Sequence, residues 1–135
     1  MRREVLTWND VDKLIDHLIP QFEVEFDAMV MITHGGIIPG GLLAEALKIN
    51  DNELLRTKKV LIVDDVWGSG RTITAVKNRI SGAGGLPYTC VLHFNPYRNL
   101  FGTARPDYYA AITDAYIVYP WEIARGPHTI LLRDL

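Results

Sequence analysis

The 135-residue sequence has a single cysteine, no long hydrophobic run and no excess of positive charge. One cysteine, Cys90, excludes a disulfide framework, and its place in an apolar run favours a buried, inert thiol in a reducing cytoplasm. No apolar run approaches the roughly 20 residues that cross a bilayer. The amino terminus has no long apolar core after its two arginines, unlike a secretory signal. We therefore expect a soluble, cytoplasmic protein that does not enter membranes.

The charge balance limits the possible partners. The chain has 14 Lys and Arg residues against 16 Asp and Glu residues, a formal net charge of −2 at pH 7, and no Lys/Arg cluster. This balance gives no general attraction for nucleic acid, so we expect none to bind, and an anionic ligand must be captured by local groups. The length suits one compact domain, which we expect to span residues 1–135.

The most informative stretch covers residues 60–72 and reads VLIVDDVWGSGRT. A continuous apolar run of this kind predicts a central parallel strand that is buried on both faces. Asp64 and Asp65 should then emerge at the carboxyl end of the strand, where ligands bind in open α/β sheets. The Gly-Ser-Gly loop and the helical spacing that follow complete a strand, a turn and a helix.

The loop after the strand has the composition of a phosphate-binding site. Gly68 and Gly70 allow backbone conformations closed to other residues, Ser69 and Thr72 carry hydroxyls, and the helix start offers unpaired N–H groups. The two acids would repel a bare phosphate ester, so the ligand should also offer hydroxyl donors or a divalent metal. A sugar phosphate meets these requirements.

Other interpretations of the stretch explain less. A Walker B strand would need a Gly-x-x-x-x-Gly-Lys-Ser/Thr loop, which the chain lacks. A response-regulator receiver would carry its acids near the start of the domain, whereas a full α/β unit precedes them here. A solvated strand end with an ordinary turn remains open, but it leaves the coincidence of acids, glycines and hydroxyls unexplained.

The stretch closely resembles the phosphoribosyl pyrophosphate (PRPP) binding motif of type I phosphoribosyltransferases. The resemblance implies that Asp64 and Asp65 hold the ribose hydroxyls. It also implies that the 5-phosphate is bound by the loop and helix start, namely Gly68, Ser69, Gly70, Arg71 and Thr72.

A second apolar run, residues 28–33, predicts another buried strand, followed by a glycine-rich loop and a helix beginning near Pro39. In the family this loop binds pyrophosphate. The resemblance therefore assigns pyrophosphate binding to Thr33, His34, Gly35 and Gly36.

In the rest of the chain, predicted strands alternate with predicted helices. Residues 7–22 predict a covering helix with a cap at their start, and a helix after Thr72 should stop at Gly82. Residues 88–94 and 108–112 predict two further strands.

Residues 114–122, which read DAYIVYPWE, are similar to the hood segment of xanthine, guanine and hypoxanthine phosphoribosyltransferases. This similarity implies that Tyr116 stacks on the base, that Ile117 offers backbone contacts, and that Glu122 helps to hold metal and pyrophosphate. Asn95 stands where purine-using relatives place a base-reading lysine, and it could donate a hydrogen bond. For Trp121, core packing is the favoured role.

The resemblance predicts a type I phosphoribosyltransferase fold: α/β, with a mainly parallel five-stranded sheet between helices, a small C-terminal hood mainly in residues 95–135 and a shortened flexible loop. It implies a glycosyltransferase that moves the phosphoribosyl group of PRPP to a nitrogenous base, most simply a 6-oxopurine, in nucleotide salvage. Mg2+, held by Glu122, Asp64 and Asp65, is the expected cofactor. A homodimer is possible.

Four departures from the family pattern leave a second hypothesis open. His34 replaces a lysine or arginine, Gly68 replaces an acid, Asn95 replaces a lysine, and residues 49–58 leave no room for a long lid. The alternative is a catalytically impaired regulatory module that binds PRPP or a nucleotide on the same fold.

Overall fold

The computed structural model describes residues 2–32 and 57–124. The predicted pyrophosphate loop (Thr33, His34, Gly35 and Gly36), the helix expected near Pro39 and most of the short lid segment lie outside the described residues. No helix within the described ranges is long and apolar enough to cross a membrane.

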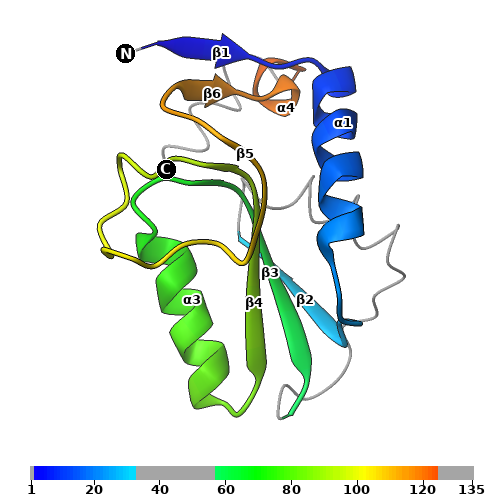
Figure 1. Cartoon of the computed structure of the whole chain (residues 1–135), viewed down its shortest axis with the longest axis vertical. Helices are drawn as coiled ribbons and strands as arrows, with labels where there is room; N and C mark the ends of the chain where they lie inside the picture. The colour runs from blue at the N-terminus through cyan, green and yellow to red at the C-terminus, as the bar shows by residue number, and fades with distance from the viewer. Residues whose placement is uncertain (1, 33–56, 125–135) are drawn as a thin grey trace.

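A four-stranded parallel sheet forms the centre of the described structure, in the order β2-β3-β4-β5 (Figure 1). Its strands are β2 (Ala28–Met31), β3 (Lys59–Trp67), β4 (Leu86–Phe94) and β5 (Tyr108–Ile112). The parallel sheet is confirmed, and β5 matches its predicted bounds. Five strands were expected, and the described residues contribute four to this sheet. Both β3 and β4 are longer than predicted, because their pairing continues past the expected ends: through Lys59 and the two acids in β3, and through Leu86 and Pro87 at the start of β4.

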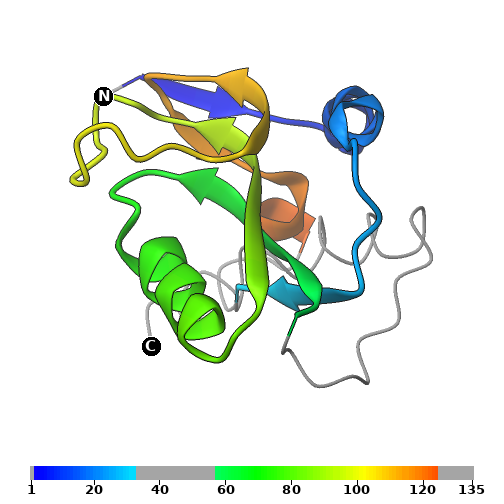
Figure 2. The ribbon, with the colours of Figure 1, turned by 60° about the horizontal axis from the view of Figure 1, so that its bottom comes forward.

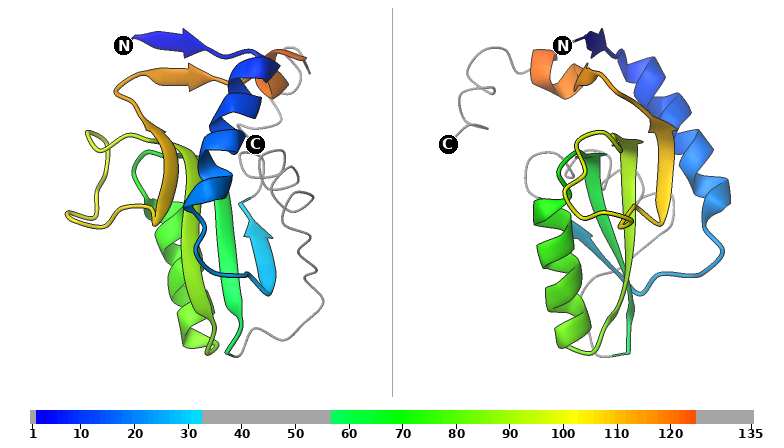
Figure 3. Two further views of the ribbon diagram at one scale, coloured as in Figure 1. Left: turned by 45° about the vertical axis from the view of Figure 1, so that its right-hand side comes forward. Right: turned by 60° about the vertical axis from the view of Figure 1, so that its left-hand side comes forward.

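Two helices cover opposite faces of this sheet, α1 (Trp8–Leu18) and α3 (Arg71–Gly82) (Figures 2 and 3). Alternate residues of β3 face each way, as strand geometry requires. Leu61 and Val63 belong to the core on the α1 side, whereas Val60 and Ile62 belong to the core on the α3 side. Cys90 is fully buried on the α1 side, as predicted, and burial raises the pKa of its thiol far above the ordinary value.

The predicted first helix is confirmed, with a shorter regular part. Thr7 caps α1: its hydroxyl accepts from the Asp10 N–H, and the Asp10 carboxylate accepts from the Thr7 N–H in a capping box. Helical bonding changes after Leu18 into a 3-10 turn, η1 (Ile19–Gln21). Pro20 has no N–H to continue the α-helical bonds, which explains the change.

A small second sheet forms the hood from opposite ends of the described chain. The strand β1 (Arg3–Val5) pairs in parallel with β6 (Tyr116–Val118), placing Arg3 opposite Tyr116, and α4 (Pro120–Ala124) follows. The strand β1, from outside residues 95–135, therefore takes part in this sheet. Sequence analysis missed β1 because all three of its residues are exposed and show no apolar alternation.

Candidate active site

A cavity lies at the start of α3, where the phosphate site was predicted, and we call it the phosphate cradle. This cavity of about 110 Å³ is lined by Asp64, Val66, Trp67, Gly68, Ser69, Gly70, Arg71, Thr72 and Ile73. The Ser69 hydroxyl accepts from the Arg71 N–H at 3.3 Å, which ties the loop to the helix start. The structure thus brings all five predicted phosphate-binding residues together.

Gly70 is required by the local geometry of the cradle. It lies at the N-cap of α3 with φ +81°, in the left-handed region that favours glycine. A Cβ atom there would lie 2.4 Å from Nε1 of Trp67, a distance that forces the indole to move. Gly70 therefore lets the chain enter the helix with the Trp67 indole close to its Cα atom.

A second segment, residues 95–106, holds the cradle from the side. The Asn95 N–H donates to the Trp67 carbonyl at 2.9 Å, and the Leu100 N–H donates to the Ser69 carbonyl at 3.0 Å. The Trp67 indole N–H also donates to the Asn99 carboxamide oxygen at 3.2 Å. Sequence analysis placed only Asn95 of this segment near the base, and nothing in the segment's composition indicated these bonds to the loop.

The hood covers a second cavity of about 70 Å³ beside the cradle. It is lined by Asp65, Val66, Asn95, Arg98, Ala115, Tyr116, Ile117, Tyr119 and Glu122. The structure therefore brings the predicted base-binding residues together with Asp65 and Glu122. Arg98 and Tyr119 are additional lining residues that sequence analysis did not assign to the site.

The two adjacent acids serve different cavities. Asp64 is half-buried and lines the phosphate cradle, whereas Asp65 is only 3% exposed and lines the hood cavity. Both lie within β3, which continues to Trp67, rather than at its end. Because successive strand residues point to opposite faces, one acidic pair can reach ligand groups on both sides of the strand.

Buried polar contacts connect β3 to the hood. The Tyr119 hydroxyl donates to the Asp65 carbonyl at 3.1 Å and lies 2.8 Å from Nδ1 of His93. Since a tyrosine hydroxyl has one hydrogen, His93 donates from Nδ1 to the Tyr119 oxygen in this arrangement. Burial lowers the pKa of His93 to about 4, so the imidazole is neutral near pH 7. Sequence analysis missed this pair, which lies 26 residues apart in the chain.

The aromatic side chain of Tyr116 is 46% exposed at the hood cavity. The Arg3 guanidinium lies over its ring, 5.7 Å from the centroid. The Asn95 carboxamide oxygen accepts from the Tyr97 N–H at 3.1 Å, so its NH2 group is the donor that remains for a ligand. Trp121 packs in the core, stacked on Tyr119 with ring centroids 4.6 Å apart, as favoured from the sequence.

Within residues 2–32 and 57–124, no group of three or more His, Cys, Asp or Glu side chains could enclose a metal ion. Asp65 and Glu122 line one cavity, and both are buried carboxylates. Mg2+ commonly takes one or two carboxylates together with substrate phosphates and waters. The donor set therefore suits a metal that arrives with a phosphorylated ligand.

Comparison with known proteins gives matches over most of the chain. The sequence profile described as "Phosphoribosyl transferase domain" matches residues 12–122. The structure is similar to that of the purine phosphoribosyltransferase from Pyrococcus horikoshii Ot3, with 28% identity, a TM-score of 0.81, and coverage of 90% of this chain and 95% of that chain. No curated protein sequence matches the chain.

Two further solved structures share the fold at lower identity. A hypothetical protein from Neisseria gonorrhoeae with bound ppGpp has 24% identity, a TM-score of 0.79, and coverage of 98% of this chain and 96% of that one. The Helicobacter pylori xanthine-guanine-hypoxanthine phosphoribosyltransferase has 15% identity, a TM-score of 0.77, and coverage of 99% and 100% respectively.

Proposed function

Because this chain belongs to the phosphoribosyl transferase family, we propose that it transfers the 5-phosphoribosyl group of PRPP to a 6-oxopurine. A glycosyltransferase-type enzyme that joins a phosphoribosyl group to a base follows from the family itself. The choice of a 6-oxopurine, the role in cytoplasmic nucleotide salvage and the use of Mg2+ are the finer parts of the proposal.

The observation that carries the proposal is the pair of cavities on either side of Asp64 and Asp65. One cavity combines a glycine loop with a helix start, and the other combines an exposed aromatic ring with buried carboxylates. A ribose 5-phosphate with a base at its C1 atom needs an anion site and an aromatic site at two ends of one sugar. The acidic pair lies between them, where the sugar hydroxyls would be.

The phosphate loop and the acidic pair act by positioning. Loop N–H groups and the start of α3 would hold the 5-phosphate, and the carboxylates would accept hydrogen bonds from the ribose hydroxyls. This grip fixes C1 of the ribose against the incoming base nitrogen. The C1–N bond forms as the C1–O bond to pyrophosphate breaks, and the proton of the base nitrogen is released to solvent. Positive charge that develops on the ribose during the displacement is stabilised by the nearby carboxylates.

The metal would be held by Asp65 and Glu122, or by Asp64 from the cradle side, in combination with oxygens of the substrate. When bound, Mg2+ neutralises charge on the departing pyrophosphate. The base would stack on Tyr116 and meet the backbone of Ile117 and the NH2 group of Asn95. Base stacking of this kind contributes about 1–3 kcal/mol.

Pyrophosphate release tests the proposal directly. PRPP and Mg2+ are incubated with guanine, hypoxanthine, xanthine, adenine, uracil or orotate, each in a separate reaction. Release that depends on an oxopurine is expected, and it should disappear in the double variant Asp64→Asn, Asp65→Asn. The variant Asp16→Asn, an exposed acid on α1, is the matched control and should behave as the unmodified protein.

No release with any base would overturn the proposed reaction. If PRPP still bound under those conditions, with binding measured by calorimetry, the regulatory alternative would take its place. Loss of PRPP binding in Asp16→Asn would instead show that the assay responds to charge in general.

A further inference from the structure

We propose that Arg98 selects the base, by donating hydrogen bonds to the O6 and N7 acceptors of a 6-oxopurine. The inference rests on the proposed function and adds a specificity-determining residue to it. Arg98 matches none of the motifs that identify the family, and it belongs to the segment between β4 and β5.

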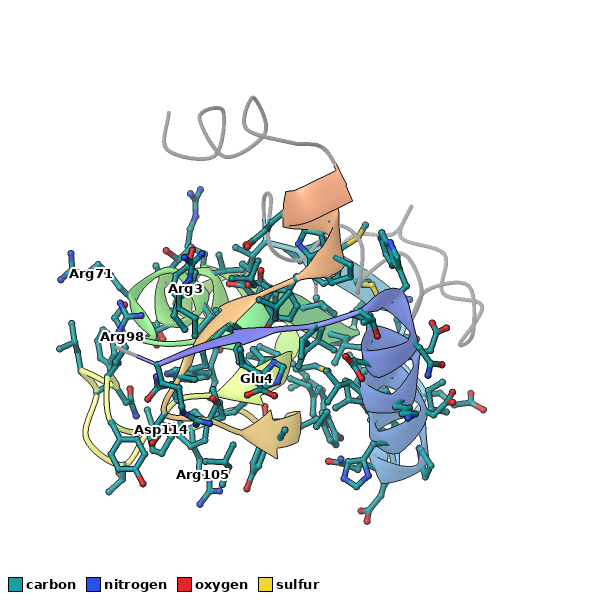
Figure 4. All side chains as sticks on the ribbon, turned by 90° about the horizontal axis from the view of Figure 1, so that it is seen from above. Arg3, Glu4, Arg71, Arg98, Arg105 and Asp114 are labelled. Carbon is teal, nitrogen blue, oxygen red and sulfur yellow. The ribbon has the colours of Figure 1, made fainter. Side chains whose placement is uncertain are left out.

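The side chain of Arg98 lies where the two cavities meet. It lines the hood cavity together with Tyr116 and Asn95. Its Cζ atom is 3.8 Å from the position that a Cβ atom would take on Gly68, which lines the phosphate cradle. Figure 4 shows Arg98 and Arg71, the first residue of α3, at the same edge of the molecule in this view.

Gly68 keeps this position open for the guanidinium. Any side chain on residue 68 would contact Arg98, and a large one would compete for the same space. The lack of an acid at residue 68 is therefore linked to the arginine beside it. A carboxylate there would pair with the arginine, whereas a glycine leaves its donors available to a ligand.

The backbone around Arg98 is held on both sides. The Arg98 N–H donates to the Asn95 carbonyl at 3.3 Å, and Asn95 is itself bonded to Trp67. On the other side, Leu100 is bonded to Ser69, and the Asn99 side chain accepts from the Trp67 indole. These bonds fix the backbone of Arg98 beside the phosphate cradle, and its exposed side chain lines the hood cavity.

Charge makes Arg98 distinct within the hood cavity. Among the described residues that line it, Arg98 is the one cation, and the ionisable groups around it are Asp65, Glu122 and two tyrosines. A guanidinium has five donors and no acceptor. Its fork matches the O6 and N7 acceptors of guanine, the geometry that also serves arginine in reading nucleic acids.

Adenine presents a different edge. It keeps the N7 acceptor but carries an amino donor in place of O6, and a donor cannot pair with a guanidinium. The NH2 group of Asn95 is also a donor and would favour the same oxygen. The two side chains together therefore favour an oxopurine over an aminopurine.

The experiment compares hypoxanthine with adenine in the unmodified protein and in Arg98→Gln and Arg98→Lys. We expect Arg98→Gln to lower kcat/KM for hypoxanthine by about 10- to 100-fold, with KM for PRPP and the rate with adenine changed less than about threefold. Arg98→Lys keeps the charge without the fork and should give an intermediate loss. Arg79→Gln removes the same charge near the other end of α3 and serves as the control.

Calorimetric binding of IMP and AMP gives a second readout that does not depend on turnover. The unmodified protein should bind IMP more tightly than AMP. In Arg98→Gln the ratio of the two dissociation constants should move toward one. Equal losses of affinity for IMP and AMP would overturn the inference. So would a changed KM for PRPP combined with an unchanged ratio of kcat/KM for hypoxanthine to kcat/KM for adenine. A preference of the unmodified protein for adenine or AMP, or no binding of either nucleotide, would overturn it as well.

These outcomes separate the two proposals. If no base supports pyrophosphate release, the proposed reaction fails, while a loss of IMP preference in Arg98→Gln would still support the role of Arg98. If the reaction proceeds and the variant keeps its base preference, the inference about Arg98 fails alone.

Discussion

The phosphate cradle and the hood cavity lie on either side of the same acidic pair, but they are built differently. Nine of the ten residues 64–73 line the cradle, and Asp65 is the one that does not. The hood cavity draws on three separate segments of the chain, at residues 65–66, 95–98 and 115–122. The comparison shows that one half of the candidate site is a local structure and that the other half depends on docking of the hood.

The hood also depends on contacts outside its own segment. Its strand β6 pairs with β1 from the beginning of the described chain, and Tyr119 reaches back to the Asp65 carbonyl. The hood shares a continuous core with α1 and one face of β3. A change of packing in this core would therefore alter the hood cavity before the phosphate cradle. The cradle is held instead by the backbone bonds from Asn95 to Trp67 and from Leu100 to Ser69.

Single substitutions of the two acids should have the largest effects on activity, and they should distinguish the roles of the two cavities. Asp64→Asn and Asp65→Asn are each expected to lower kcat/KM by at least about 100-fold, since each removes a charge that acts on the transition state. Steady-state kinetics should show that Asp65→Asn also raises KM for the base, whereas Asp64→Asn raises KM for PRPP. Identical effects of the two variants on both substrates would contradict the division between cavities.

Gly70→Ala tests the local character of the cradle. We expect a loss of about 2–3 kcal/mol in the free energy of unfolding, because the new Cβ atom meets Trp67 and the left-handed backbone becomes strained. Gly82→Ala is the matched control, since a Cβ atom there meets nothing within 4 Å. Urea denaturation measures both variants, and equal stabilities would refute the explanation.

His93 links pH to the stability of the hood side. Its pKa is about 4 in the folded protein, against an ordinary value of 6.5. Between these values the unfolded chain binds a proton that the folded protein does not, so stability should fall as pH drops from 6.5 to 4, by up to about 3 kcal/mol. His93→Gln should reduce this dependence in denaturation curves recorded at several pH values. His17→Gln, an exposed histidine on α1, should leave it unchanged.

Tyr116→Ala is expected to have the smallest effect. Loss of the stacking surface should weaken IMP binding by about 1–3 kcal/mol, while the free energy of unfolding changes little because the side chain is 46% exposed. Tyr97→Ala removes a tyrosine that is 79% exposed and outside the lining of the hood cavity, and it should leave IMP binding unchanged. Calorimetry distinguishes the two, and equal losses would remove Tyr116 from the base site.

Much of the central architecture could be predicted from the sequence because its signals are local. The apolar run before Asp64 indicated a buried strand, the cap at Thr7 indicated a helix start, and β5 has its predicted bounds. The cradle was predictable for the same reason, since glycines, hydroxyls and a helix start act within a few residues of one another.

The hood was predicted only through its resemblance to a family, and its supporting contacts were not predicted. Three exposed residues of β1 carry no periodic signal, and the contact between His93 and Tyr119 is invisible until β4 and the hood are docked. Arg98 resembled any solvated loop arginine until the bonds of Asn95, Asn99 and Leu100 placed it beside Gly68.

The sequence by itself determined the strand, loop and helix of the phosphate cradle, because those elements are specified by neighbouring residues. It also determined that two acids stand at this point of the chain. Only the tertiary structure decided that Asp64 faces the cradle while Asp65 faces the hood cavity with Arg98 and Tyr119. The physical reason is that a cavity is lined by side chains from several segments, and their relative positions are set by packing across the sheet.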